Sequence, residues 1–491
     1  MDLTLLPSTG LLLGLCGTLL LLLLLVGPRQ QRGLPPGPKG LPLLGNALQL
    51  DWRALPRSLM ELSGKYGPIF TVWFGRRPAI VLCGSEMLRE ALLNHAEAFG
   101  GREPLAAAQR VTEGYGITLT NGERWKQLRR FSIATLRNFG MGKKSVEQRV
   151  AEESQALVST IKGRKGQPFD PFPLFRCAAA NVVCSIVFGQ RFEYTDERFI
   201  HLLGLISDNI HRLGGPWGTL YNAMPSIMGS IPGFFNQYEQ NGKLLKTFVN
   251  VLIEEHKVGW QPNCPRDYID CFIDKMEAEK NNANTEFTPM NMLICVLNLF
   301  MAGTETTART LESGIRALIQ HPQLQEKMQQ EMEGELGRDR TPTYAVRLHL
   351  PLCNAVVHEI HRYGCIAPTA LWHRMTQDTQ FKGFVIPRDT LVIPMICSAL
   401  NEETKWGSPG TFDPGNFLDA DGRFLKNDAF MPFSTGKRAC LGEALAMTEV
   451  FTFITSLVQS FNLRPGCSED PPGIGVGPLP SHVRAQPRVT L

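Results

Sequence analysis

The sequence predicts a mainly α-helical protein with a small β region, preceded by one N-terminal transmembrane helix. Three features of the 491-residue chain support this prediction: a leucine-rich start, a few short apolar runs, and long helical patterns over most of the remainder. The length is compatible with about three domains or with one large enzyme domain. We expect a membrane anchor over residues 1–27, a proline-rich hinge over 28–42 and one large domain over 43–491.

The N-terminal segment has the length and composition of a membrane-spanning helix. No charge occurs between Asp2 and Arg29, and residues 3–26 contain 14 leucines, whereas about 20 apolar residues span the hydrocarbon core. A cleaved signal peptide is the alternative, but the segment lacks a positively charged start and a small-residue cleavage site. Since Arg29 and Arg32 follow the helix, the positive-inside rule places the large domain in the cytosol.

Prolines dominate the next segment, where four of the eight residues from Pro35 to Pro42 are proline. Such a stretch cannot continue a helix and favours extended backbone. It is either a plain linker or a semi-rigid hinge that orients the large domain against the membrane.

Helical patterns dominate the large domain, and strand-like segments are few. The apolar runs 70–74 and 79–82 predict a strand pair, and strand-like residues return near 380–396. The less regular segment 213–235 is either a core loop or a surface that enters the bilayer. The long helical patterns cover residues 123–138, 145–162, 289–319, 323–336 and 442–461.

Composition excludes several classes of protein. The net charge of +4 and the lack of a dense basic tail argue against a nucleic-acid partner. The 12 cysteines are scattered and form no CxxC pair, which argues against a disulfide scaffold or a zinc site.

One of these cysteines, Cys440, lies where a glycine-containing loop ends and a helical pattern begins. The N–H groups and dipole of a helix N-terminus stabilise an anion and lower the pKa of a thiol. A thiolate there can bind iron, with Phe433 covering the sulfur and Arg438 pairing with a carboxylate. Gly436 and Gly442 would let the backbone approach a flat macrocycle closely.

The residues around Cys440 match the haem-binding signature F-x-x-G-x-R-x-C-x-G at Phe433, Gly436, Arg438, Cys440 and Gly442. In this motif, and over essentially its whole length, the chain resembles the cytochrome P-450 superfamily. It is most similar to the animal microsomal family 2, on the strings at residues 121–125, 139–143 and 266–272. The resemblance implies the cytochrome P-450 fold and haem b (iron protoporphyrin IX), with Cys440 as iron ligand. It also implies a place in the endoplasmic reticulum membrane, with the catalytic domain on the cytosolic side.

A second motif, the string from Ala302 to Thr307, lies inside the helical pattern that ends near residue 319. The resemblance implies that this helix crosses the distal face of the haem, with Ala302 beside it. Gly303 would loosen the helix locally. Thr306 would then turn its hydroxyl towards bound dioxygen, and Glu305 would relay protons as a general acid.

Two further motifs concern charged pairs. Glu359 and Arg362 are three residues apart, so they can pair on one helix face, and the resemblance implies a buried structural ion pair. Its usual third partner is a cation, and here the matching residue is Asn416.

Trp125 and Arg129 also share a helix face, and the resemblance implies that they hold a haem propionate. Arg102, His373 and Arg438 match further propionate-binding positions. Charge-assisted hydrogen bonds of about 1.5–3 kcal/mol each would anchor this dianionic edge.

The positions that match the substrate pocket of the superfamily are mostly apolar, which predicts a lipophilic substrate held by burial. Each position is alternatively plain core. Trp372 stands where a proline is expected and would reshape the pocket. The positions are Leu105, Thr118, Leu119, Phe300, Ala302, Ala367, Leu371 and Val476.

Basic residues cluster in the segments expected to flank Cys440 and form either a solvated surface or a docking face for an acidic electron donor. No GxGxxG motif follows a strand, so electrons must come from a partner. The resemblance implies an NADPH-dependent flavoprotein reductase, with cytochrome b5 as a second donor. The basic residues are Arg124, Lys126, Arg129, Arg130, Lys143, Lys144 and Lys437.

The leading hypothesis is a haem-thiolate monooxygenase that uses O2 and NADPH to oxidise lipophilic small molecules such as xenobiotics, fatty acids or steroids. One alternative is a haem-thiolate isomerase or lyase acting on peroxides, which needs no proton relay of the kind that Glu305 and Thr306 suggest. The other is a non-catalytic haem carrier.

Overall fold

The computed structural model describes residues 14, 17, 18, 33–138, 144–229, 231, 233, 235–337, 340–466 and 482–488. The expected membrane anchor, apart from three residues, and the first part of the hinge lie outside this range. Within it, no helix is long and apolar enough to cross a membrane.

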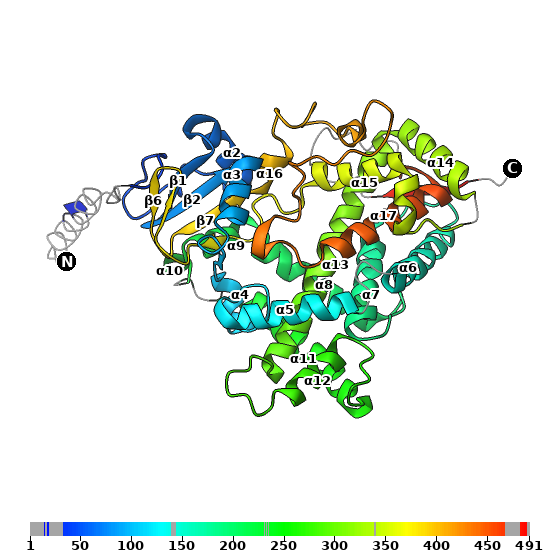
Figure 1. Cartoon of the computed structure of the whole chain (residues 1–491), viewed down its shortest axis with the longest axis horizontal. Helices are drawn as coiled ribbons and strands as arrows, with labels where there is room; N and C mark the ends of the chain where they lie inside the picture. The colour runs from blue at the N-terminus through cyan, green and yellow to red at the C-terminus, as the bar shows by residue number, and fades with distance from the viewer. Residues whose placement is uncertain are drawn as a thin grey trace, which may run out of the picture.

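A small sheet region occupies one side of the molecule, at the left of Figure 1. Its five strands have the order β1-β2-β7-β4-β3. The predicted pair is confirmed: β1 and β2 are antiparallel, with Ile69 opposite Leu82. Because side chains alternate along a strand, the sheet contributes to hydrophobic clusters on both faces. The strands are β1 (Ile69–Phe74), β2 (Arg77–Cys83), β3 (Gly101–Arg102), β4 (His373–Arg374) and β7 (Leu391–Met395).

Two further strand pairs form separate two-stranded sheets, and short helices flank the five-stranded sheet. The pairs are β5 (Thr379–Phe381) with β6 (Phe384–Ile386), and β8 (Phe461–Pro465) with β9 (Val483–Pro487). The helices are α2 (Leu55–Tyr66), α3 (Ser85–Arg89), continued by the π-helix Glu90–Asn94, and α16 (Ile396–Leu400).

The rest of the molecule is helical and is built around α13 (Pro289–Gln320) (Figure 1). The five predicted helices are confirmed, with ends that shift by at most a few residues. The other helices are α4 (Ala106–Thr112), α5 (Gly122–Asn138), α6 (Lys144–Lys162), α7 (Phe172–Val187), α8 (Glu197–Gly214), α9 (Pro216–Ala223), α10 (Pro225–Met228), α11 (Asn236–Gly259), α12 (Tyr268–Ala278), α14 (Pro322–Leu336), α15 (Pro351–Gly364) and α17 (Glu443–Ser460).

Gly303 has a packing role in α13. The helix is continuous through this residue, so the predicted local loosening is wrong. A Cβ atom at Gly303 would lie 2.5 Å from Cγ2 of Val183 on α7. A side chain at Gly303 would require Val183 to shift, so glycine allows the close packing of α13 against α7.

The segment 213–235 is more regular than expected, since α9 and α10 occupy much of it. Tyr221 and Phe235 are buried and their ring centroids lie 4.4 Å apart. Trp217 and Ile231, by contrast, are 64% and 47% exposed. The segment therefore contributes to the core through one set of residues and presents apolar surface through another.

Candidate functional site

Cys440 lies in a tight loop just before α17, which begins at Glu443. The Cys440 N–H donates to the carbonyl of Phe433 at 2.9 Å, which closes the loop. Gly436 has φ +77°, and a Cβ there would lie 1.8 Å from the carbonyl oxygen of Leu92. Glycine is required at this position because the backbone of Leu92 lies so close. At Gly442 a Cβ would lie 4.0 Å from the Cys440 sulfur, so this glycine leaves space beside the sulfur.

The pKa of the Cys440 thiol is raised, contrary to the sequence-based expectation. Burial among protein atoms raises it most, and the amide of Gly442 and the charge of Arg129 only partly offset this effect. The side chain nevertheless remains accessible. The helix N-terminus by itself therefore does not make this thiol acidic.

Three arginines converge beside the cysteine loop from three separate segments: Arg102 on β3, Arg129 on α5 and Arg438 in the loop itself. Arg129 donates to the carbonyl of Ala439 at 2.6 Å. Arg438 donates to the carbonyls of Gly100 and Thr120, both at 2.9 Å. In the described part of the chain, none of the three forms an ion pair with a carboxylate.

This arginine cluster lacks a counter-charge. Burial, with a smaller effect of neighbouring arginines, lowers the pKa of Arg102 to about 9 and that of Arg438 to about 8. Nε of Arg102 and Nη1 of Arg438 are buried without a hydrogen-bond partner. Since buried cations are normally paired, the geometry calls for an anion between these side chains.

Trp125 and His373 complete the surroundings of this cluster. The Arg438 guanidinium lies 3.7 Å from the Trp125 ring centroid, and that of Arg129 lies 5.9 Å away. His373 is buried, and its Nδ1 lies 2.7 Å from the carbonyl oxygen of Phe99. Burial and the charges of Arg102 and Arg438 hold the pKa of His373 well below its usual range. The five residues expected at the propionate edge are therefore brought together.

The two residues expected to handle protons differ in their surroundings. Thr306 is exposed, and its hydroxyl donates to the carbonyl of Ala302 at 2.6 Å. Glu305 is buried, and its Oε1 accepts bonds of 3.2 Å from Ser207 and Arg309. Its Oε2 is buried without a partner. Glu305 thus keeps one acceptor for a further polar group.

The predicted ion pair is confirmed: Arg362 Nη2 and Glu359 Oε1 are 2.7 Å apart, and both side chains are fully buried. Arg362 also donates to three backbone carbonyls, each at 2.8 Å. The amide of Asn416 lies 3.5 Å from Glu359 Oε1, so a neutral group stands where a cation was expected.

The expected substrate-pocket residues divide into two groups. Leu105 and Leu119 pack together with Ala108, and Thr118 lies beside them in the chain with intermediate exposure. The more open positions are Ala302, Ala367 and Leu371. Val476 lies outside the described residues.

Two residues expected to shape the pocket belong to the core instead. Phe300 is fully buried and packs edge-on against Phe188, with centroids 5.8 Å apart. Trp372 stacks on Phe74 at 5.8 Å within the hydrophobic cluster on one face of the sheet. Trp372 is next to the exposed Leu371, and Phe300 is two residues from the exposed Ala302, so sequence spacing alone could not distinguish the two directions.

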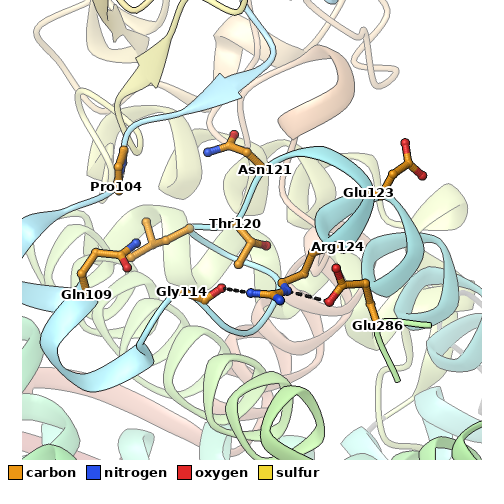
Figure 2. Close-up of a pocket in the computed structure, with 9 residues that line it drawn as sticks. Pro104, Gln109, Gly114, Thr120, Asn121, Glu123, Arg124 and Glu286 are labelled. Atoms are coloured by element: carbon orange, nitrogen blue, oxygen red, sulfur yellow. Dashed lines mark hydrogen bonds and ion pairs between the residues drawn. The ribbon is translucent and has the colours of Figure 1, made fainter. Parts of the chain in front are cut away.

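A shallow pocket of about 600 Å³ opens between α4, α5 and the segment before α13, and Figure 2 shows its lining. The Arg124 side chain lines this pocket and donates at 2.7 Å to both the carbonyl of Gly114 and the carboxylate of Glu286. Arg124 is therefore engaged here and does not belong to a free basic face. Of the expected substrate residues that the structure describes, only Leu119 lines this pocket; the others lining it are Pro104, Gln109, Gly114, Thr120, Asn121, Glu123, Arg124 and Glu286.

Three asparagines with important contacts were missed by the sequence analysis. Asn121 accepts from both the Arg102 amide and the Arg438 side chain, while Asn291 and Asn298 on α13 bind the loop before α5. Only Asn121 lay in a motif, the string at 121–125 that suggested the family. The other two carry no local signal, because their partners are far away in the sequence.

Comparison with known proteins agrees with this arrangement. A sequence model of the family described as Cytochrome P450 matches residues 35–484. Cytochrome P450 2B9 of Mus musculus is 44% identical over 479 residues, covering 96% of this chain and 98% of that protein. Cytochrome P450 2C8 of Homo sapiens is 44% identical over 435 residues, covering 89% of each. The chain therefore belongs to the cytochrome P450 family and is a haem-thiolate monooxygenase.

Proposed function

We propose that Cys440 supplies the thiolate ligand of the haem iron, and that the enzyme oxidises lipophilic small molecules with O2 and electrons from NADPH. The observation that carries this proposal is the cluster of Arg102, Arg129 and Arg438 beside the cysteine loop, which lacks a counter-anion. The two propionates of haem b would supply the negative charge that this cluster lacks. When bound, the haem supplies an iron centre that activates O2, with the thiolate favouring O–O cleavage.

Different groups of residues would hold different parts of this cofactor. Arg102, Arg129, Arg438, His373 and Trp125 would hold the propionate edge. Phe433, Gly436 and Gly442 would shape the loop around the sulfur, and Ala302 would lie against the opposite face. Binding of the propionates would also relieve the mutual repulsion of the arginines, so haem binding and folding should support each other.

Thr306 and Glu305 would deliver protons to the reacting oxygen. The Thr306 hydroxyl, which now donates to its own helix, would rotate to donate towards the haem side. Glu305 would replace that proton from solvent through its free oxygen.

Replacing Thr306 by alanine should uncouple O2 consumption from product formation. We expect product per O2 consumed to fall about tenfold or more, since a positioned proton donor contributes about 10²–10⁴-fold. Oxygen uptake and product should be measured together with purified reductase. Thr304→Ala is the matched control, because the Thr304 hydroxyl is fully buried and bonds the Phe300 carbonyl. Unchanged coupling in Thr306→Ala would show that the relay role is wrong.

The substrate would be lipophilic, because the expected pocket positions within the described residues are mostly apolar. Leu105, Leu119, Ala302, Ala367 and Leu371 carry no polar side-chain group, and Thr118 adds one hydroxyl. Xenobiotics, fatty acids and steroids all fit such a lining. A panel of the three classes, screened for spectral shift and NADPH-dependent product, identifies the class.

The electron donor would be the membrane-bound NADPH-dependent flavoprotein reductase, with cytochrome b5 as a second donor. Lys437 pairs with Glu97 beside the cysteine loop, and the charge of Lys126 also lowers the pKa of Glu97, so the two lysines are neighbours. Lys126→Glu should slow reduction by the reductase at low salt, and high salt should remove the difference. Lys243→Glu on α11 is the control, and equal rates for the two variants would contradict a donor face here.

We also propose that residues 1–27 anchor the protein in the endoplasmic reticulum membrane, with residues 28–42 as hinge and 43–491 on the cytosolic side. Apolar surface supports this: Leu43 and Leu48 are 43% and 74% exposed, and Trp217 is 64% exposed. The two regions are close, since Ala47 and Met224 share one hydrophobic cluster. Loss of the protein from carbonate-washed membranes after deletion of residues 1–32 is the expected result.

A further inference from the structure

A side-chain oxygen of α13 holds the loop between α4 and α5. Oδ1 of Asn298 accepts the N–H of Ile117 at 3.0 Å and the N–H of Thr118 at 3.3 Å. Two backbone donors that no strand or helix satisfies are thereby paired. Figure 2 shows the outer side of this loop, where Gly114 and Thr120 line the shallow pocket.

A second asparagine, two helical turns earlier on the same face of α13, continues this attachment. Oδ1 of Asn291 accepts the N–H of Gly116 at 3.1 Å. Its Nδ2 donates to the carbonyl of Glu286 at 2.7 Å and to the carboxylate of Glu286 at 3.2 Å. Asn291 therefore needs both its acceptor and its donor, whereas the contacts of Asn298 with the loop use the oxygen alone.

Gly116 shows how closely the loop approaches the helix. Its φ is +87°, and a Cβ there would lie 2.5 Å from both Oδ1 of Asn298 and Cγ2 of Ile294. The loop also bonds to itself here, because the Thr120 hydroxyl donates to the Gly116 carbonyl at 2.6 Å. This glycine is required by the contact with Asn298.

The far end of the same loop reaches the arginine cluster. The carbonyl of Thr120 and Oδ1 of Asn121 each accept from Nη2 of Arg438 at 2.9 Å. Between the two ends, Leu119 packs against Leu105. A shift of the loop relative to α13 would therefore move Leu119 together with these two hydrogen-bond acceptors of the Arg438 side chain.

We propose that Asn291 and Asn298 are positioning residues that set the place of this loop, and with it the substrate-facing Thr118 and Leu119 and the orientation of Arg438. The proposal rests on the proposed function for the roles of the pocket and of Arg438. The attachment itself is independent of them.

The two asparagines should respond oppositely to the same substitution. Asn298→Asp keeps an oxygen acceptor for both N–H groups, so the loop should stay in place. Asn291→Asp loses the donor and sets a carboxylate beside Glu286, so the loop should loosen. Asn298→Ala removes the acceptor and should loosen it as well. Gly116→Ala should also loosen the loop, because the added Cβ would clash with Asn298.

Hydrogen exchange of the haem-loaded full chain tests the attachment. In Asn298→Ala the amides of residues 116–118 should exchange about tenfold faster or more, the equivalent of about 1.4 kcal/mol. In Asn298→Asp they should match the unaltered protein. Asn250→Ala, on the exposed face of α11, is the matched control. Equal exchange in Asn298→Ala and the unaltered protein would overturn the proposal.

Steady-state kinetics with a lipophilic substrate test the consequence for the site. The KM of Asn298→Ala should rise several-fold with a smaller change in kcat, and Asn298→Asp should restore it. Faster amide exchange of residues 116–118 in Asn298→Ala with an unchanged KM would overturn the positioning role. Absence of NADPH-dependent turnover in the unaltered protein would count instead against the proposed function, because the exchange measurement does not depend on turnover.

Discussion

Replacing Cys440 by serine should abolish the reduced carbon monoxide spectrum of a thiolate-ligated haem, together with all substrate-dependent turnover. The loop itself should survive, since it is closed by the backbone bond from Cys440 N–H to the Phe433 carbonyl. Serine has nearly the same shape, so the change isolates the ligand atom. The loss is expected because thiolate donation to the iron favours O–O cleavage, and a neutral hydroxyl cannot replace it.

Reduced carbon monoxide spectra and NADPH-dependent product formation measure this effect. Cys264→Ser is the control, because Cys264 is an exposed cysteine in the connection between α11 and α12. It should leave both readouts unchanged. A Cys440→Ala protein that kept the Soret band of a thiolate-ligated haem would show that another residue is the ligand. Burial raises the pKa of the free Cys440 thiol, and a bond to iron would favour its thiolate form.

Replacing Glu359 by alanine should lower the free energy of unfolding by about 3–5 kcal/mol, the usual effect of removing one partner of a buried ion pair. The substitution leaves the fully buried Arg362 charged, with backbone carbonyls and the Trp406 ring but no carboxylate partner. It also removes the acceptor of the Asp413 N–H. Urea unfolding of the haem-loaded protein measures the change.

Glu61→Ala is the matched control for this prediction. Glu61 forms an ion pair with Arg57 in which the two side chains are 67% and 82% exposed, so its loss should cost about 0.2–1 kcal/mol or less. Glu359→Gln, which keeps an acceptor, should fall between the two. Equal stability of Glu359→Ala and Glu61→Ala would mean that this pair does not support the fold. Because Asn416 gives Glu359 only a neutral partner, Arg362 carries the full counter-charge.

Local patterns were sufficient for five of the helices and for the family. The helices α5, α6, α13, α14 and α17 were visible as periodic apolar patterns, and the β1–β2 pair as two short apolar runs, because both signals come from neighbouring residues. The long helices α7, α8 and α11 were not predicted. The Glu359–Arg362 pair was visible for the same reason, since its members are three residues apart on one helix. The cysteine loop, with five matching residues in ten positions, indicated the chemistry.

Local patterns did not reveal the roles of residues that contact parts of the chain far away in the sequence. Gly303 packs against Val183 and Gly436 against the carbonyl of Leu92, and local patterns indicated neither contact. Phe300 and Trp372 face the core, and Arg124 faces Glu286. In each case the deciding atom lies tens to hundreds of residues away in the chain.

The sequence by itself determined that this protein is a haem-thiolate enzyme of the cytochrome P450 family, because the residues that identify the chemistry lie close together in short motifs. Only the tertiary structure decided how they act together. Arg102, Arg129 and Arg438 become one anion site when β3, α5 and the cysteine loop meet, and Asn298 becomes important when the loop before α5 folds onto α13. Electrostatic and hydrogen-bond effects act over a few ångströms in space, and the separation of two residues in the sequence does not show whether they are that close.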